Sequence, residues 1–130
     1  MNKKDRIFLR KILEYHKVLT GAIKDFKIAD KSDLDNIHYM VRRGMIQTVG
    51  DIFELSSSLP FEILSKLPLN SETIKQFRNT ATHSYGRINN VFAYACIIHC
   101  SDRKLSSVIT ELLADDEASP NELETKIDEN

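Results

Sequence analysis

Apolar residues recur every three or four positions through most of the 130-residue chain, with short polar breaks between. This spacing is typical of helices with one buried side. It predicts a helix over about residues 3–27, with the apolar stripe Phe8, Ile12, Tyr15, Leu19, Ile23 and Phe26. It predicts a second, from an N-cap at Ser32 to about Ser58, with the stripe Leu34, Ile37, Val41, Met45, Thr48, Ile52 and Leu55. The near-heptad spacing of the second stripe favours an antiparallel bundle or a dimer seam.

Prolines, capping residues and a glycine divide the next part of the chain. Residues 56–70 contain two prolines and should form a loop with one short helix near residues 60–66. Asn70 or Ser71 should cap the following helix, and Gly86 should end it in a left-handed conformation. The side of this helix that faces the core should carry Ile74, Phe77 and Ala81.

Two more helices are predicted, over about residues 87–100 and 102–113. The first should bury Ile88, Val91, Phe92, Ala95 and Ile98. The second should bury Leu105, Val108, Ile109 and Leu112. Since no segment alternates with a period of two, we expect an all-α fold: an antiparallel helical bundle of four to five main helices.

Charge separates the end of the chain from the rest. Residues 115–130 contain seven acids and one lysine, a net charge of -6, whereas the first 114 residues carry +5. We therefore expect a bundle domain over residues 1–114 and a disordered acidic tail over residues 115–130. The mildly basic body permits a polyanionic partner without requiring one.

Composition and hydropathy favour a cytoplasmic protein with no membrane contact. Apolar residues make up 42% and charged residues 28% of the chain, as in ordinary globular domains. No apolar run approaches the roughly 20 residues that span a bilayer. The N-terminus is charged and lacks the apolar core of a secretory signal.

Cysteines and histidines are common metal ligands, but the spacing of these residues does not favour a metal site. Cys96, His99 and Cys100 lie at helical spacing, but a zinc site needs three or four converging ligands, normally with a second pair from a loop. We expect reduced, buried thiols, a capping histidine, and neither metal nor cofactor. His16 and His38 stand alone on predicted helices and should lie at the surface or an interface.

The segment RNTATHSYG, residues 78–86, carries the candidate chemistry. Asn79 and His83 are four apart, so the amide can orient the imidazole on one face of a helix. Arg78 lies about 140° around that helix from His83 and can reach a phosphate held near it. A cation, an imidazole and an amide make a metal-free phosphodiester site plausible. Alternatively, Arg78 and His83 only complement the dipole at a helix C-terminus.

The pattern Arg78-Asn79-x3-His83-x-Tyr85 resembles the R-x4-H-x-Y signature of HEPN proteins, specifically the HepT type. DRIFLRKILEYHKVLTGAI is similar to the family's first helix, and Gly50-Asp51 falls where the family tends to have Gly-Glu. The resemblance covers about residues 3–113. Asp51 departs from the family pattern by one methylene, and the phenylalanine-glycine pair that often follows the tyrosine is reduced to Gly86. The family usually has an aromatic residue just before the helix that carries the motif, and this chain has Ser71 or a neighbouring residue in its place.

The resemblance implies a metal-independent ribonuclease: a homodimeric toxin encoded beside a nucleotidyltransferase antitoxin of the MntA type. It implies that His83 is the general base or acid and that Arg78 stabilises charge on the RNA phosphate. Asn79 would position His83 or the phosphate. Tyr85 would line the cleft and accept a nucleotidyl group, AMP, from the antitoxin. Asp51 would be a supporting acid, or only a surface charge.

Two other functions fit the residues. One is a non-catalytic HEPN module that presents substrate or a docking surface to the nucleotidyltransferase, and the other is a helical scaffold unrelated to nucleic acids. The complete set of motif residues favours the nuclease, because a module that only binds does not need an ionisable histidine. Arg42 and Arg43 could extend an RNA-binding surface or simply form a solvated face.

Overall fold

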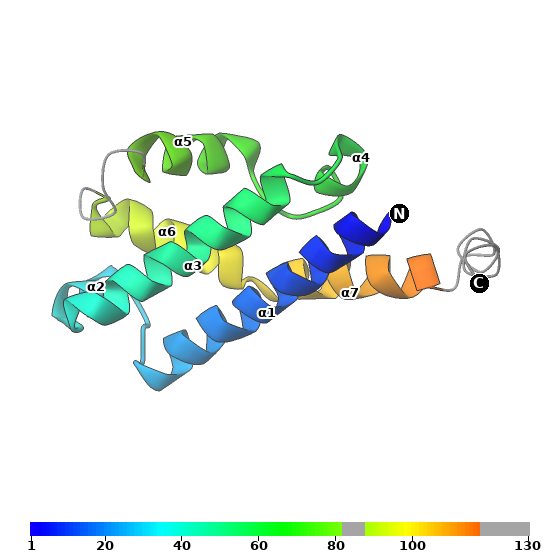
Figure 1. Ribbon diagram of the computed structural model, residues 1–130. Helices are drawn as coiled ribbons and strands as arrows, with labels where there is room; N and C mark the ends of the chain where they lie inside the picture. Colours follow the sequence, from blue (N-terminus) through cyan, green and yellow to red (C-terminus); the bar gives the residue numbers. More distant parts are fainter. Residues whose placement is uncertain (82–87, 118–130) are drawn as a thin grey trace.

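The structure, a computed structural model, describes residues 1–81 and 88–117. These residues form helices and no strand, which confirms the all-α class. The helices are α1 (Lys3–Asp25), α2 (Lys31–Asn36), α3 (Tyr39–Ser57), α4 (Phe61–Leu64), α5 (Ser71–Ala81), α6 (Asn90–Ser101) and α7 (Arg103–Glu117). In Figure 1, α3 runs opposite to α1, α5 runs opposite to α3, and α6 and α7 continue one after the other in the direction of α3.

The predicted second helix is two helices in the structure. Ile37 is extended between them, and His38 caps α3 by accepting a hydrogen bond at Nδ1 from the Met40 N–H, at 3.1 Å. The N-cap of α2 is Asp30 rather than Ser32. Asp30 accepts from the Ser32 N–H at 2.9 Å, while the Asp33 carboxylate accepts from the Asp30 N–H at 3.0 Å. This reciprocal capping box satisfies amides that a cap at Ser32 would leave unpaired.

The other helix ends follow from local caps. Asn70 caps α5 by accepting from the Glu72 and Thr73 N–H groups, which confirms one of the two predicted caps. α6 begins at Asn90, three residues later than predicted, because Asn89 accepts from the Phe92 N–H at 2.9 Å. α1 ends at Asp25, two residues early, and Lys27 beyond it has a left-handed φ of 53°.

The core lies where α1 and α3 pack on each other and on α6, with α7 against α1. Its fully buried members include Leu9, Ile12, Leu19, Ile52, Phe53, Ile97, Leu105 and Ile109. α5 joins this core through Ile74 and Phe77, both buried. The Phe77 ring meets the Phe53 ring of α3 edge-on, with 5.3 Å between centroids. This contact places the C-terminal half of α5 on α3.

The predicted buried side of α6 is wrong in part. Val91, Ala95 and Ile98 are exposed, and the buried residues of this helix are Ala93, Cys96, Ile97 and Cys100. Because α6 is apolar all round, its periodicity does not define one buried side. Even so, none of the helices in the described part of the chain is long and apolar enough to cross a membrane.

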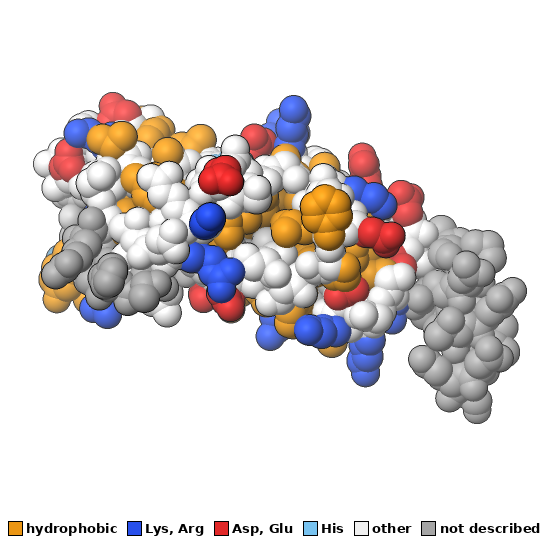
Figure 2. Space-filling model, turned by 90° about the horizontal axis from the view of Figure 1, so that it is seen from above, with side chains coloured by type: hydrophobic (Ala, Val, Ile, Leu, Met, Phe, Trp, Pro, Cys, Tyr) orange, Lys and Arg blue, Asp and Glu red, His pale blue; other side chains and the backbone are white. Residues whose placement is uncertain are grey.

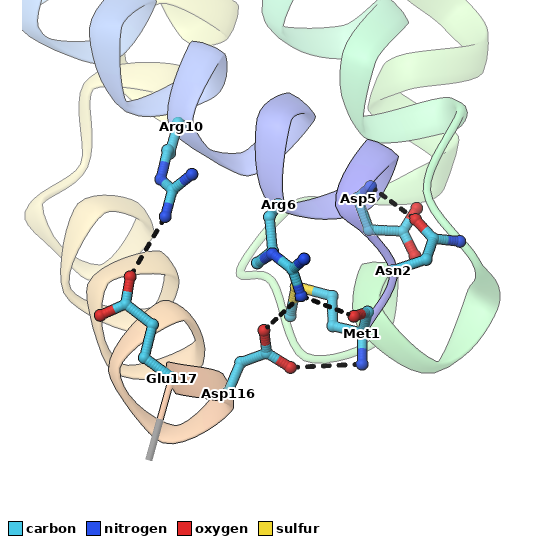
Figure 3. Close-up of polar contacts among 7 residues, drawn as sticks. All are labelled: Met1, Asn2, Asp5, Arg6, Arg10, Asp116 and Glu117. Atoms are coloured by element: carbon cyan, nitrogen blue, oxygen red, sulfur yellow. Dashed lines mark hydrogen bonds and ion pairs between the residues drawn. The ribbon is translucent and has the colours of Figure 1, made fainter. Parts of the chain in front are cut away.

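α7 extends beyond the predicted domain boundary at residue 114. Asp116 pairs with the N-terminal amine of Met1 and with Arg6, both at 3.2 Å, and Arg10 pairs with Glu117 at 3.1 Å (Figure 3). The first acids assigned to the tail, residues 115–117, therefore belong to the helix. The rest of the predicted tail lies outside the described residues.

Candidate functional site

Arg78 and Asn79 lie together at one groove. Its volume is about 470 Å³, and it lies between the C-terminal end of α3, α4 and α5. The described residues that line it are Ser57, Leu64, Ser71, Ile74, Lys75, Arg78 and Asn79. Figure 2 views the molecule from the side of α5, and hydrophobic side chains appear there between charged ones.

The sequence of α5 explains why these two side chains reach the groove. Ile74 and Phe77 are buried, so they fix which side of the helix faces the core. Arg78 and Asn79 follow directly and are exposed. They lie three and four residues after Lys75, so the three polar side chains share one face of the helix.

Arg78 forms an ion pair with Glu54 of α3, at 3.6 Å. Both side chains are more than half exposed, 53% for Arg78 and 68% for Glu54. An ion pair this exposed contributes about 0–1 kcal/mol, so an incoming phosphate can compete with Glu54 for the guanidinium. Sequence reasoning missed Glu54, because its pairing depends on how α5 packs on α3.

Asp51, the predicted supporting acid, lies one turn before Glu54 on α3, outside the described lining of the groove. It is half-buried, and burial raises the pKa of its carboxyl above the usual value. The carboxylate that pairs with Arg78 is that of Glu54, and the supporting role of Asp51 stays a prediction.

His83 and Tyr85 lie in residues 82–87, outside the described residues. The chain enters that segment from Ala81, the last residue of α5, and leaves it at Ile88, which is buried.

Arg42 anchors the chain just after this segment. Its guanidinium donates to the backbone carbonyl of Ile88 and to the side-chain oxygen of Asn90, and the Asn90 amide donates to Asp35. We call Arg42, Asn90 and Asp35 the Arg42 clamp. The solvated-face interpretation of Arg42 is therefore wrong: Arg42 is half-buried and joins α3 to the start of α6. Arg43, its neighbour, is exposed.

Cys96 and Cys100 are buried free thiols, as predicted. Burial raises the pKa of Cys96 to about 12 and that of Cys100 well above its usual value, so both stay protonated.

His99 Nε2 accepts a hydrogen bond from the Asn70 N–H at 2.9 Å, which links α6 to the cap of α5. Burial lowers the pKa of His99, and the opposing effect of Asp102 is smaller. Across residues 1–81 and 88–117, no three His, Cys, Asp or Glu side chains converge as metal ligands.

The other two histidines have different surroundings. His16 is buried, contrary to the prediction, and its Nε2 lies 3.0 Å from the Asp102 carbonyl oxygen. A carbonyl only accepts, so Nε2 carries the hydrogen. His16 falls four residues after Ile12 and three before Leu19, so the apolar stripe of α1 already marked it as a core position. His38 is exposed, as predicted, and caps α3.

A scan against protein-family models found none that matches this chain, and searches of curated proteins and of solved structures found no similar chain.

Proposed function

We propose that this protein is a metal-independent endoribonuclease toxin of the HEPN superfamily, acting in the cytoplasm as a homodimer. An MntA-type nucleotidyltransferase would neutralise it by adding AMP to Tyr85. The observation that carries the proposal is that Arg78 and Asn79 line one groove at the end of α5. The chain continues directly from there into His83 and Tyr85.

The reaction needs only groups that the motif supplies. His83 of one protomer takes the proton from an RNA 2′-hydroxyl, whose oxygen attacks the adjacent phosphorus. The bond from phosphorus to the 5′-oxygen breaks, and that oxygen takes a proton from the second His83 of the dimer. The products are a 2′,3′-cyclic phosphate and a 5′-hydroxyl. Two-fold symmetry supplies the base and the acid from one sequence position.

The environment of Arg78 supports its role in this scheme. Its planar guanidinium matches two phosphate oxygens, and these carry more charge in the transition state than in the ground state. The exposed ion pair with Glu54 holds the guanidinium at the groove, and it contributes about 0–1 kcal/mol. Asn79, the next residue, is exposed at the same groove and can orient the phosphate or the imidazole.

Nucleotidylation of Tyr85 would act by exclusion. AMP adds bulk and negative charge two residues from His83, where the RNA phosphate must approach. Inactivation then requires no change of fold.

Expression of the protein without a partner tests the proposal in cells. The wild type should arrest growth, whereas His83→Ala and Arg78→Ala should not. Tyr85→Phe should stay toxic when the nucleotidyltransferase is co-expressed, and its intact mass should not rise by one AMP. Equal toxicity of all versions, or none from any, would favour the non-catalytic HEPN module instead.

A further inference from the structure

The groove beside Arg78 is larger than a single phosphate needs. Leu64 and Ile74 provide apolar surface, while Lys75, Arg78 and Asn79 provide polar groups along one side. An apolar surface next to two cations, Lys75 and Arg78, fits a ligand that has flat apolar faces linked by anionic groups. A nucleotide has that chemistry.

Lys75 lies one helical turn before Arg78 and lines the same groove. Residues three apart on a helix have Cβ atoms about 5–6 Å apart, and the four-carbon stem of lysine extends its reach further. Lys75 is exposed and forms no ion pair with the carboxylates of the described residues. The two cations can therefore bind two successive phosphates of one strand.

Phe61 lies at the start of α4, one turn before Leu64. Its side chain is 82% exposed, more than any other large hydrophobic residue in the described part of the chain. Phe61 is not one of the residues that line the groove, but residues three apart on a helix share a face, so its ring can reach a ligand that contacts Leu64. Solvent-exposed aromatic rings are the usual stacking surfaces for unpaired bases. A base in a duplex would not offer its face to this ring.

We propose that the groove between α3, α4 and α5 is a nucleotide subsite for the RNA strand. Lys75 binds the phosphate next to the one held by Arg78, and an unpaired base lies against Leu64, Ile74 and Phe61. The identification of the ligand as RNA rests on the proposed function. Glu54, which competes for Arg78, weakens binding at this subsite.

Binding in the absence of cleavage tests the subsite. The protein carries His83→Ala, and the probe is a fluorescent single-stranded RNA of about ten nucleotides, followed by anisotropy at several salt concentrations. Lys75→Ala should weaken binding several-fold and reduce the slope of log affinity against log salt by about 0.7, the value for one phosphate contact. Lys104→Ala, the control on α7, removes the same charge away from the groove and should change neither quantity.

Two further variants separate the base contact from the phosphate contact. Phe61→Ala should weaken binding at least about five-fold with the salt slope unchanged, because it removes stacking and no charge. Glu54→Gln should strengthen binding, because it removes the competing carboxylate. Equal effects of Lys75→Ala and Lys104→Ala, or no effect of Phe61→Ala, would overturn the subsite.

The outcomes distinguish this inference from the proposed function. If the wild type cleaves RNA but binding is insensitive to Lys75 and Phe61, the subsite is wrong and the nuclease stands. If RNA binds with the predicted pattern but the wild type never cleaves it, the subsite stands and the nuclease is wrong. If the chain neither binds nor cleaves RNA, both are wrong.

Discussion

Phe77 of α5 packs edge-on against Phe53 of α3, with 5.3 Å between the ring centroids, and the next residue along the chain is Arg78. The position of the candidate guanidinium therefore depends on an aromatic contact in the core. Arg78 in turn pairs with Glu54, the residue after Phe53. On both helices, the residue that makes the aromatic contact (Phe53 on α3, Phe77 on α5) is followed directly by the residue that makes the ion pair.

Removing the Phe77 ring should destabilise the fold. Phe77 is 2% exposed, so Phe77→Ala leaves a cavity and should lower the free energy of unfolding by about 3–5 kcal/mol. Urea denaturation followed by circular dichroism measures this. Phe61→Ala is the matched control, since that ring is exposed and its loss should change stability by less than about 0.5 kcal/mol. Similar losses in both variants would contradict the packing described for α5.

The Arg42 clamp should contribute to the free energy of unfolding, whereas the neighbouring Arg43 should not. Arg42→Ala removes charge-assisted hydrogen bonds to the Ile88 carbonyl and the Asn90 side chain, and we expect a loss of about 1–3 kcal/mol. Arg42→Lys should recover only part of this, because a lysine lacks the planar fork that reaches both acceptors. Arg43→Ala, one residue away and exposed, should stay near wild type in the same denaturation experiment. A large loss from Arg43→Ala, or none from Arg42→Ala, would rule out the clamp.

His99 should make stability sensitive to mild acid. In the folded state its pKa is lowered by burial, so the neutral ring is favoured, and its Nε2 accepts from the Asn70 N–H. As the pH falls, His99 of the unfolded chain takes up a proton at about pH 6.5, whereas His99 of the folded chain takes one up only at a lower pH. The contribution of neutral His99 to the free energy of unfolding is therefore fully present above about pH 6.5. It is lost as the pH falls through the lowered pKa that His99 has in the folded state.

A variant without this titration provides the measurement. His99→Gln keeps an acceptor for the Asn70 N–H but has no proton to gain, so its melting temperature should fall less than that of the wild type between about pH 7.5 and about pH 5. A parallel acid dependence in the two proteins would show that His99 does not drive it.

The sequence predicts most of the helices because their apolar residues are periodic and their ends carry capping residues. It does not predict the break at Ile37 and His38, where no proline or glycine interrupts the pattern and His38 itself becomes the cap. It also fails on the buried side of α6, since Val91 and Ile98 are as apolar as the buried Ile97. The local His38 cap sets the start of α3, whereas contacts with other helices decide which side of α6 is buried.

The candidate site is predicted only as far as its residues are close in sequence. Arg78 and Asn79 share a groove, as expected of neighbours near the end of a helix. The contribution of Glu54 from α3 and of Leu64 from α4 depends on contacts between helices, which spacing along the chain does not reveal. Asp51 lies outside the described lining of this groove, so its supporting role stays a prediction.

The most direct test of the account is cleavage of a single-stranded RNA by the purified protein in the presence of a metal chelator. The wild type should cut the RNA and leave 2′,3′-cyclic phosphate ends, detectable by mass spectrometry, whereas Arg78→Ala and His83→Ala should each lose about a hundred-fold or more in rate. Lys104→Ala should cleave at the wild-type rate. Cleavage that disappears with the chelator, or that survives in both Arg78→Ala and His83→Ala, would contradict a metal-free site built on these two residues.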